Sequence, residues 1–310
     1  MATEPIITVL DMHVAQRRLS LNLTVLSDYW ALTKPEVNLL IVVTTFVGFY
    51  LGHASGSGDF PFLLSINTLL GTLLVASGTG TLNQYIERSF DAQMRRTSRR
   101  PLAAGRLKLS AVLWFGVALS VFGTIYLVLA VNVLASLLAL ATLLSYLFLY
   151  TPLKRKTPLC TLAGAFPGAI PPLIGWAGAT GKLSFEAWIL YAILFLWQFP
   201  HFMAIAWMYR EDYDRAGYLV LPRGSRARIS LVSRQTLLPL LALLPLGLVP
   251  ALIGRASTLY CIGASLLTLG FFYCGAQFVI SKSNGAARRL LAASIIYLPL
   301  LFVLMVLPKG

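Results

Sequence analysis

The chain has 310 residues, of which 57% are hydrophobic and only 12% are charged. Soluble domains carry about a quarter charged residues, and apolar runs of bilayer-crossing length recur here from end to end. The composition therefore excludes an ordinary soluble protein and predicts an all-α, polytopic membrane protein, in which the net charge of +14 must first be tested as a topology signal.

We expect a polar lead over residues 1–28 and a single intramembrane domain over residues 29–310. Nine apolar runs in this domain predict nine transmembrane helices. They cover residues 37–52, 62–86, 110–130, 134–151, 159–178, 186–208, 236–253, 257–280 and 290–307. Pro167, Pro171 and Pro172 lie in the fifth run, and we expect them to break it.

The basic residues support this arrangement. With nine spans, 22 of the 25 Lys and Arg residues fall on the side of the N-terminal lead, and only Lys182, Arg255 and Lys309 fall on the other side. Because loops rich in Lys and Arg stay in the cytoplasm, we expect a bacterial-type cytoplasmic (inner) membrane, a cytoplasmic N-terminus and a C-terminus on the opposite side. The excess charge is then mostly topogenic, which removes nucleic acid as a partner.

Three oxygen-bearing residues end the second run at intervals of four: Asn83, Glu87 and Asp91. This spacing places all three on one face of a helix. Five arginines follow within fifteen residues, namely Arg95, Arg96, Arg99, Arg100 and Arg106. Oxygen ligands beside fixed positive charge suit a polyanion bridged by Mg²⁺. The alternative is a polar helix end followed by a basic loop that only sets the topology.

A second acidic cluster, Glu211, Asp212 and Asp214, follows the sixth run on the same predicted side of the membrane. Two acidic sites at one face fit a diphosphate bound through divalent metal ions. Alternatively, these acids only balance Arg210 and Arg215 in a solvated loop. A transporter places its ionisable groups nearer the bilayer midplane, so the interfacial position favours catalysis on a lipid with a polar head.

These motifs resemble those of the UbiA-type intramembrane prenyltransferases. Asn83-x-x-x-Glu-x-x-x-Asp91 resembles their first aspartate-rich motif, and Asp212-Tyr-Asp-Arg-Ala-Gly217 resembles their second. Two positions depart from the pattern, because Glu87 stands where aspartate is frequent and Ala216 where many relatives have an acid. The second departure leaves open which acid of the second cluster binds metal.

Three further stretches resemble the branch of this superfamily that farnesylates protohaem. They are Tyr150-Thr-Pro-Leu-Lys-Arg-Lys-Thr157, the Gly- and Pro-rich run over residues 164–176, and Trp197-Gln-Phe-Pro-His201-Phe. The resemblance, which covers about residues 28–305, implies a nine-helix UbiA-type bundle with a central cavity, Mg²⁺ as cofactor, and farnesyl diphosphate and protohaem IX as substrates. The implied product is haem O for haem A and terminal-oxidase biogenesis, with haem A synthase or oxidase assembly factors as further partners.

The resemblance also implies a division of roles. Catalysis and metal binding fall to Asn83, Glu87, Asp91 and Asp212, with Glu211 and Asp214 as further metal ligands, and substrate binding falls to Arg95, Arg96, Lys154, Arg155 and His201. His201 either contacts the haem, through its iron or a propionate, or only packs between helices. Two other functions stay open: a UbiA-type prenyltransferase with an aromatic or chlorin acceptor, and a polytopic transporter without chemistry.

Overall fold

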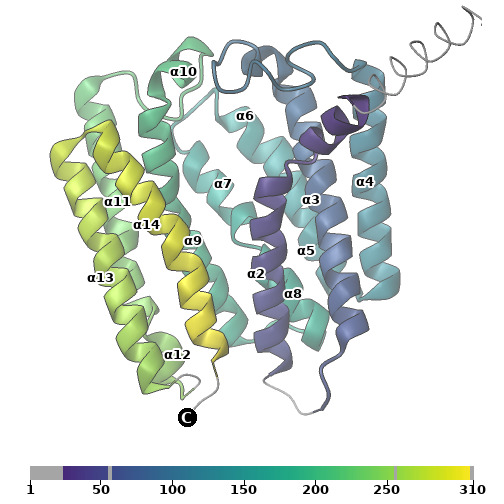
Figure 1. Cartoon of the computed structure of the whole chain (residues 1–310), viewed down its shortest axis with the longest axis vertical. Coiled ribbons are helices and arrows are strands. Elements are labelled where there is room, and N and C mark those ends of the chain that lie inside the picture. The colour runs from purple at the N-terminus through teal and green to yellow at the C-terminus, as the bar shows by residue number, and fades with distance from the viewer. Residues whose placement is uncertain (1–23, 55–57, 255–256, 308–310) are drawn as a thin grey trace, which may run out of the picture.

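The computed structural model describes residues 24–54, 58–254 and 257–307, and every regular element in these ranges is helical. The predicted lead over residues 1–28 lies mostly outside them. Figure 1 shows the long helices side by side in one bundle. The elements are α2 (Pro35–His53), α3 (Phe62–Asp91), α4 (Leu109–Ala130), α5 (Val133–Leu144), the π-helical segment η1 (Ser145–Tyr150), α6 (Thr151–Leu153), α7 (Cys160–Gly168), α8 (Pro171–Thr180), α9 (Phe185–Met208), α10 (Arg210–Arg215), α11 (Ser225–Leu246), α12 (Val249–Leu252), α13 (Thr258–Ser281) and α14 (Asn284–Val306).

The fifth predicted span is two short helices rather than one long one. α7 and α8 are separated at Ala169 and Ile170, and Pro171 begins α8 at its first turn, where a missing N–H is tolerated. Within the described ranges, eight helical segments are long and apolar enough to cross a bilayer. The count of nine spanning helices is therefore not confirmed, whereas the break at the prolines is. Figure 1 shows α7 nearer one end of the bundle and α8 nearer the other.

Two other predicted spans differ in length from the helices that contain them. α3 continues past residue 86 to Asp91, so the acidic stack lies inside the helix. α11 begins at Ser225, well before the predicted start at residue 236. Apolar runs mark only the part of a helix that lies in hydrocarbon, whereas polar turns extend the same helix beyond it.

α2 and α8 pack with their backbones in contact. A Cβ atom at Gly175 of α8 would overlap the carbonyl oxygen of Thr45, and one at Gly48 of α2 would overlap that of Pro172. Small residues allow this close approach in membrane proteins, where van der Waals packing replaces the hydrophobic effect between helices. The contact fixes α8 against α2, whose first residue follows Lys34.

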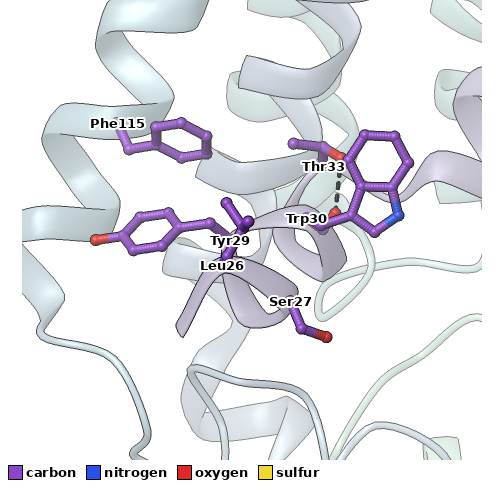
Figure 2. A pocket seen from close by; sticks show the side chains of 6 residues that line it. All are labelled: Leu26, Ser27, Tyr29, Trp30, Thr33 and Phe115. Carbon is purple, nitrogen blue, oxygen red and sulfur yellow. Dashed lines mark hydrogen bonds between the residues drawn. The ribbon is translucent and has the colours of Figure 1, made fainter. Parts of the chain in front are cut away.

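An apolar hollow of about 820 Å³ lies where the helical residues 24–32 meet α4 (Figure 2). Its edge-to-face pair, Tyr29 and Phe115, has ring centroids 5.0 Å apart. The amide of Gln84 on α3 donates to the carbonyl of Leu32 at 2.9 Å, which ties this segment to the bundle. The hollow is lined by Leu26, Ser27, Tyr29, Trp30, Thr33 and Phe115. It lies at the edge of the bundle (Figure 1) and is not the central cavity that we expect from the resemblance, which stays a prediction.

Candidate active site

The predicted stack on α3 is buried. Asn83, Glu87 and Asp91 are 1%, 6% and 2% exposed, and they follow one face of the helix as their spacing predicts. α3 ends at Asp91, whose carbonyl accepts hydrogen bonds from the Thr97 hydroxyl at 2.9 Å and the Met94 amide at 3.3 Å. These bonds satisfy a helix-end carbonyl and turn the following loop back over the stack.

Asn83 is held from two sides. Its Oδ1 accepts a hydrogen bond from Lys34 Nζ at 2.8 Å, and its Nδ2 donates to Thr151 Oγ1 at 3.2 Å. Lys34 has left-handed backbone angles, φ 54° and ψ 62°, directly before Pro35. This backbone conformation is unfavourable for lysine, and residues held in such conformations are concentrated at functional sites. Burial lowers the pKa of Lys34 to about 7, and the nearby Arg100 charge acts in the same direction.

Each carboxylate of the stack is paired with a cation from another segment. Lys154 Nζ, just after α6, lies 2.7 Å from Glu87 Oε1, and its ammonium also lies 4.5 Å from the centre of the Tyr150 ring. Arg100 NH1, in the loop after α3, lies 2.8 Å from Asp91 Oδ2. Each negative charge of the stack is therefore already compensated by one positive side chain: Glu87 by Lys154 and Asp91 by Arg100.

Asp212 on α10 contacts the loop that follows α3. The backbone N–H of Arg96 donates to Asp212 Oδ2 at 3.3 Å, and Arg215 NH1 lies 3.0 Å from the other oxygen. Figure 1 shows α10, the α6 turn and the C-terminal end of α3 at the same end of the bundle. The two acidic clusters, 121 residues apart between Asp91 and Asp212 in the sequence, are thus neighbours in space, as the predicted topology required.

The other two acids of the second cluster have different surroundings. The Glu211 side chain is 81% exposed and lies 3.9 Å from Arg210. Asp214 pairs with Arg228 at 3.1 Å. Because these two acids are three residues apart on a short helix, they share a face that differs from the face of Asp212. Of the three candidates, Asp212 is the one that forms a hydrogen bond to the loop that follows α3 within the described ranges.

Three of the predicted substrate-binding arginines lie at the rim. The side chains of Arg95, Arg96 and Arg155 are exposed. Arg96 covers the ring of Tyr209 at 5.1 Å, and Arg155 covers that of Phe90 at 4.8 Å. Arg95 takes part in no ion pair within the described ranges. Lys154 is therefore the predicted cation that enters the buried part of the site.

Two residues beside the stack, Lys34 and Tyr218, were not named as candidates from the sequence, and Arg100 was named only as one of five arginines in the loop. Lys34 and Arg100 belong to turns, where no periodicity indicates which side chain faces inward. Arg100 also lies within a run of arginines, so its residue type did not distinguish it from its neighbours. Tyr218 is buried in the turn after α10, with its ring 5.5 Å from that of Phe90. A tyrosine directly after the glycine of the second motif was the available signal.

His201 lies on α9 against α14. Its ring stacks on Trp197 with centroids 4.9 Å apart, and its Nδ1 is 2.8 Å from Ser294 Oγ. Ser294 Oγ donates its own proton to the Leu291 carbonyl at 2.6 Å. The serine must therefore accept from Nδ1–H, which leaves the lone pair on Nε2. These contacts make His201 a helix-packing residue with one nitrogen still available to a ligand.

The oxygen donors of this site are of the kind that Mg²⁺ binds. In the described part of the chain, no three His, Cys, Asp or Glu side chains are arranged to hold a metal ion together. Mg²⁺, however, commonly uses one or two carboxylates and completes its shell with substrate phosphates and water. Asn83, Glu87 and Asp91 on α3, and Asp212 against the loop that follows α3, carry hard oxygen atoms of the kind that this requirement needs.

The sequence matches known proteins along most of its length. Residues 38–303 match the UbiA prenyltransferase family. The curated "Protoheme IX farnesyltransferase" of Solibacter usitatus (strain Ellin6076) is 48% identical over 288 residues, which are 91% of this chain and 98% of that protein. The protein of the same name from Koribacter versatilis (strain Ellin345) is 41% identical over 293 residues, covering 92% and 94%.

Solved structures share the fold. A digeranylgeranylglyceryl phosphate synthase aligns with a TM-score of 0.72 at 18% identity, covering 91% of this chain and 97% of its own. A UbiA homolog from Archaeoglobus fulgidus bound to GPP and Mg²⁺ aligns with a TM-score of 0.62 at 13% identity, covering 90% and 100%. The match over residues 38–303 and the curated relatives agree with this likeness in fold, and the chain belongs to the UbiA prenyltransferase family.

Proposed function

We propose that this chain transfers the farnesyl group of farnesyl diphosphate to a vinyl group of protohaem IX, with addition of water, to give haem O and diphosphate. The observation that carries the enzymatic part is the contact between Arg96 and Asp212. This contact brings α10 against the loop that follows the acidic end of α3, which supports one shared site for a diphosphate. The haem acceptor follows from near full-length similarity to proteins named protoheme IX farnesyltransferase.

In the proposed complex, Asn83, Glu87, Asp91 and Asp212 hold Mg²⁺. When bound, Mg²⁺ neutralises negative charge on the diphosphate and makes it a better leaving group. Three basic side chains occupy oxygen atoms of the α3 residues in this set: Lys34 contacts Asn83 at 2.8 Å, Lys154 contacts Glu87 at 2.7 Å, and Arg100 contacts Asp91 at 2.8 Å. We propose that these cations turn to the diphosphate, where fixed positive charge stabilises the developing negative charge of the leaving oxygens.

The chemistry divides into bond cleavage and capture. The C–O bond of the donor breaks, and its electron pair leaves with the diphosphate. The π electrons of the haem vinyl group form the new C–C bond to the allylic cation, and a water oxygen adds to the adjacent carbon and loses a proton. A site enclosed by helices keeps other water from the cation until capture.

The remaining predicted residues have supporting roles in this proposal. Arg95, Arg96 and Arg155, at the exposed rim, attract the diphosphate from solvent. Glu211 and Asp214 keep their arginine partners and stay outside the metal site, which narrows the predicted ligand set. Nε2 of His201, which carries the lone pair, contacts the haem through its iron at the face between α9 and α14.

We also propose the orientation. The acidic end of the bundle carries the loops that hold most of the basic residues, so it faces the cytoplasm by the positive-inside rule. The protein is then a multi-pass protein of the cytoplasmic (inner) membrane, with its N-terminus inside. Its product leaves to haem A synthase or an oxidase assembly factor.

The test uses purified protein in liposomes with labelled farnesyl diphosphate and Mg²⁺. Haem and 4-hydroxybenzoate are offered as acceptors in separate reactions, and the extracted products are identified by absorption and mass spectra. The proposal predicts label on haem, with the mass of one farnesyl group and one water added. Transfer to the aromatic acid instead would identify a different acceptor class, and no transfer to either would contradict the enzymatic reading.

A further inference from the structure

The hydroxyl of Tyr218 is a buried donor without a partner. The residue is 3% exposed, and within the described ranges its hydroxyl forms no hydrogen bond. Leaving a buried hydroxyl unpaired destabilises a protein, so such groups are rare and need a physical explanation. The residue lies outside the predicted site set, and the proposed function does not use it.

Its place is set by backbone contacts rather than by its hydroxyl. The Tyr218 amide donates to the Tyr213 carbonyl at 2.9 Å, and the next amide, of Leu219, donates to the carbonyl of Lys154 at 2.7 Å. The ring packs on Phe90 with centroids 5.5 Å apart. The turn that carries Tyr218 is thus joined to the segment that carries the site lysine and to the last turn of α3.

The charged groups around the hydroxyl belong to the active site. Glu87, Lys154 and Asp91 all act on it electrostatically, Glu87 most strongly. The hydroxyl lies close to Glu87, although the two groups do not meet the geometry of a hydrogen bond. Glu87 itself lies 2.7 Å from Lys154 Nζ. A tyrosine hydroxyl is protonated at neutral pH, since its ordinary pKa is about 10, so this group can donate a hydrogen bond.

We propose that the Tyr218 hydroxyl donates a hydrogen bond to the diphosphate of the prenyl donor, which makes it a further substrate-binding residue. The inference rests on the proposed function and adds a neutral donor to the lysines and arginines of the site. A diphosphate bound among Glu87, Asp91 and Lys154 would supply an acceptor in a geometry that no group in the described part of the chain offers to this hydroxyl. The rival explanation is structural: the hydroxyl donates a hydrogen bond to the Glu87 carboxylate and only keeps that side chain in place.

The test compares Tyr218→Phe with Tyr260→Phe. Tyr260 is also buried, but its hydroxyl donates to the Gly247 carbonyl at 2.7 Å, away from the site. Binding of farnesyl thiolodiphosphate with Mg²⁺ is measured by calorimetry, and unfolding temperature is measured without ligand. We expect Tyr218→Phe to weaken binding about tenfold, the effect of losing a hydrogen bond to a charged group, at an unchanged or higher unfolding temperature. We expect Tyr260→Phe to lower the unfolding temperature and to leave the affinity unchanged.

Two results would overturn the proposal. One is wild-type affinity in Tyr218→Phe. The other is a fall in its unfolding temperature as large as that of Tyr260→Phe, which would show that the hydroxyl is already bonded inside the protein. A wild-type protein that fails to bind the analogue at all would contradict the proposed function itself, and this inference with it.

Discussion

The ammonium of Lys154 lies 2.7 Å from the carboxylate of Glu87, and the two side chains are only 12% and 7% exposed. Burying two charges is favourable only while each compensates the other. We expect Lys154→Met to leave Glu87 buried and unpaired, and to lower the free energy of unfolding by about 3–5 kcal/mol. Denaturant unfolding in detergent micelles measures this change.

The control is a double-mutant cycle with Glu87→Gln. Removing both charges relieves the desolvation that either single variant suffers, so the double variant should lose less stability than the sum of the two. Strictly additive losses would show that the two side chains do not stabilise each other.

Arg100 and Arg99 are adjacent arginines with different partners. Arg100 pairs with Asp91 at 2.8 Å, whereas Arg99 is exposed and takes part in no ion pair within the described ranges. We expect Arg100→Gln to weaken binding of the prenyl diphosphate by about 10- to 100-fold, since hydrogen bonds to charged groups are the strong ones. Arg99→Gln should bind as the wild type does. Equal losses in the two variants would mean that only the overall charge of the loop matters.

The contact between α2 and α8 predicts a stability effect far from any charge. Ala at Gly175 would overlap the Thr45 carbonyl, whereas Gly270 on α13 has open space around it. We expect Gly175→Ala to destabilise by about 1–3 kcal/mol through overpacking. Gly270→Ala should be neutral or stabilising by about 0.5–1 kcal/mol, because alanine is the better helix former. Unfolding temperatures check both, and a tolerated Gly175→Ala would refute the backbone contact.

His201 offers a test that separates haem binding from packing. We expect His201→Ala to weaken haem binding about tenfold, about the loss of one ligand contact, and to leave the KM for farnesyl diphosphate unchanged. Ser294→Ala removes the hydrogen bond to Nδ1 but keeps the imidazole, so its haem affinity should stay within about twofold of wild type. Haem titration followed by absorption measures both, and equal losses in the two variants would assign His201 to packing alone.

The acidic stack was predictable because a helix translates sequence spacing directly into one face. Asn83, Glu87 and Asp91 needed no tertiary information to be recognised as a group, and all three are buried on α3. The meeting with Asp212 was predictable only through topology, because the charge asymmetry of the loops placed both clusters on one side. Which acid of the second cluster makes the contact depended on the orientation of a six-residue helix, which the sequence did not specify.

The cationic partners were not predictable in the same way. Lys34 reaches Asn83 from a left-handed residue, and Arg100 reaches Asp91 from a turn, so neither follows a helical period. The prolines after Gly164 indicated the break between α7 and α8. The number of spanning helices was not predictable there. A hydropathy average hides a break of only two residues, so α7 and α8 together read as one long apolar span.

The central claim is that the α3 stack and Asp212 together bind the prenyl diphosphate through Mg²⁺. The most direct measurement is transfer of labelled farnesyl to haem by the wild type, Asp91→Asn and Asp212→Asn, with Mg²⁺ and with EDTA. Asp28→Asn serves as control, since Asp28 also pairs with an arginine, Arg106. We predict transfer that EDTA abolishes, that falls at least about 100-fold in both site variants, and that persists in the control. Transfer that survives EDTA, or that either site variant retains at the control rate, would contradict the claim.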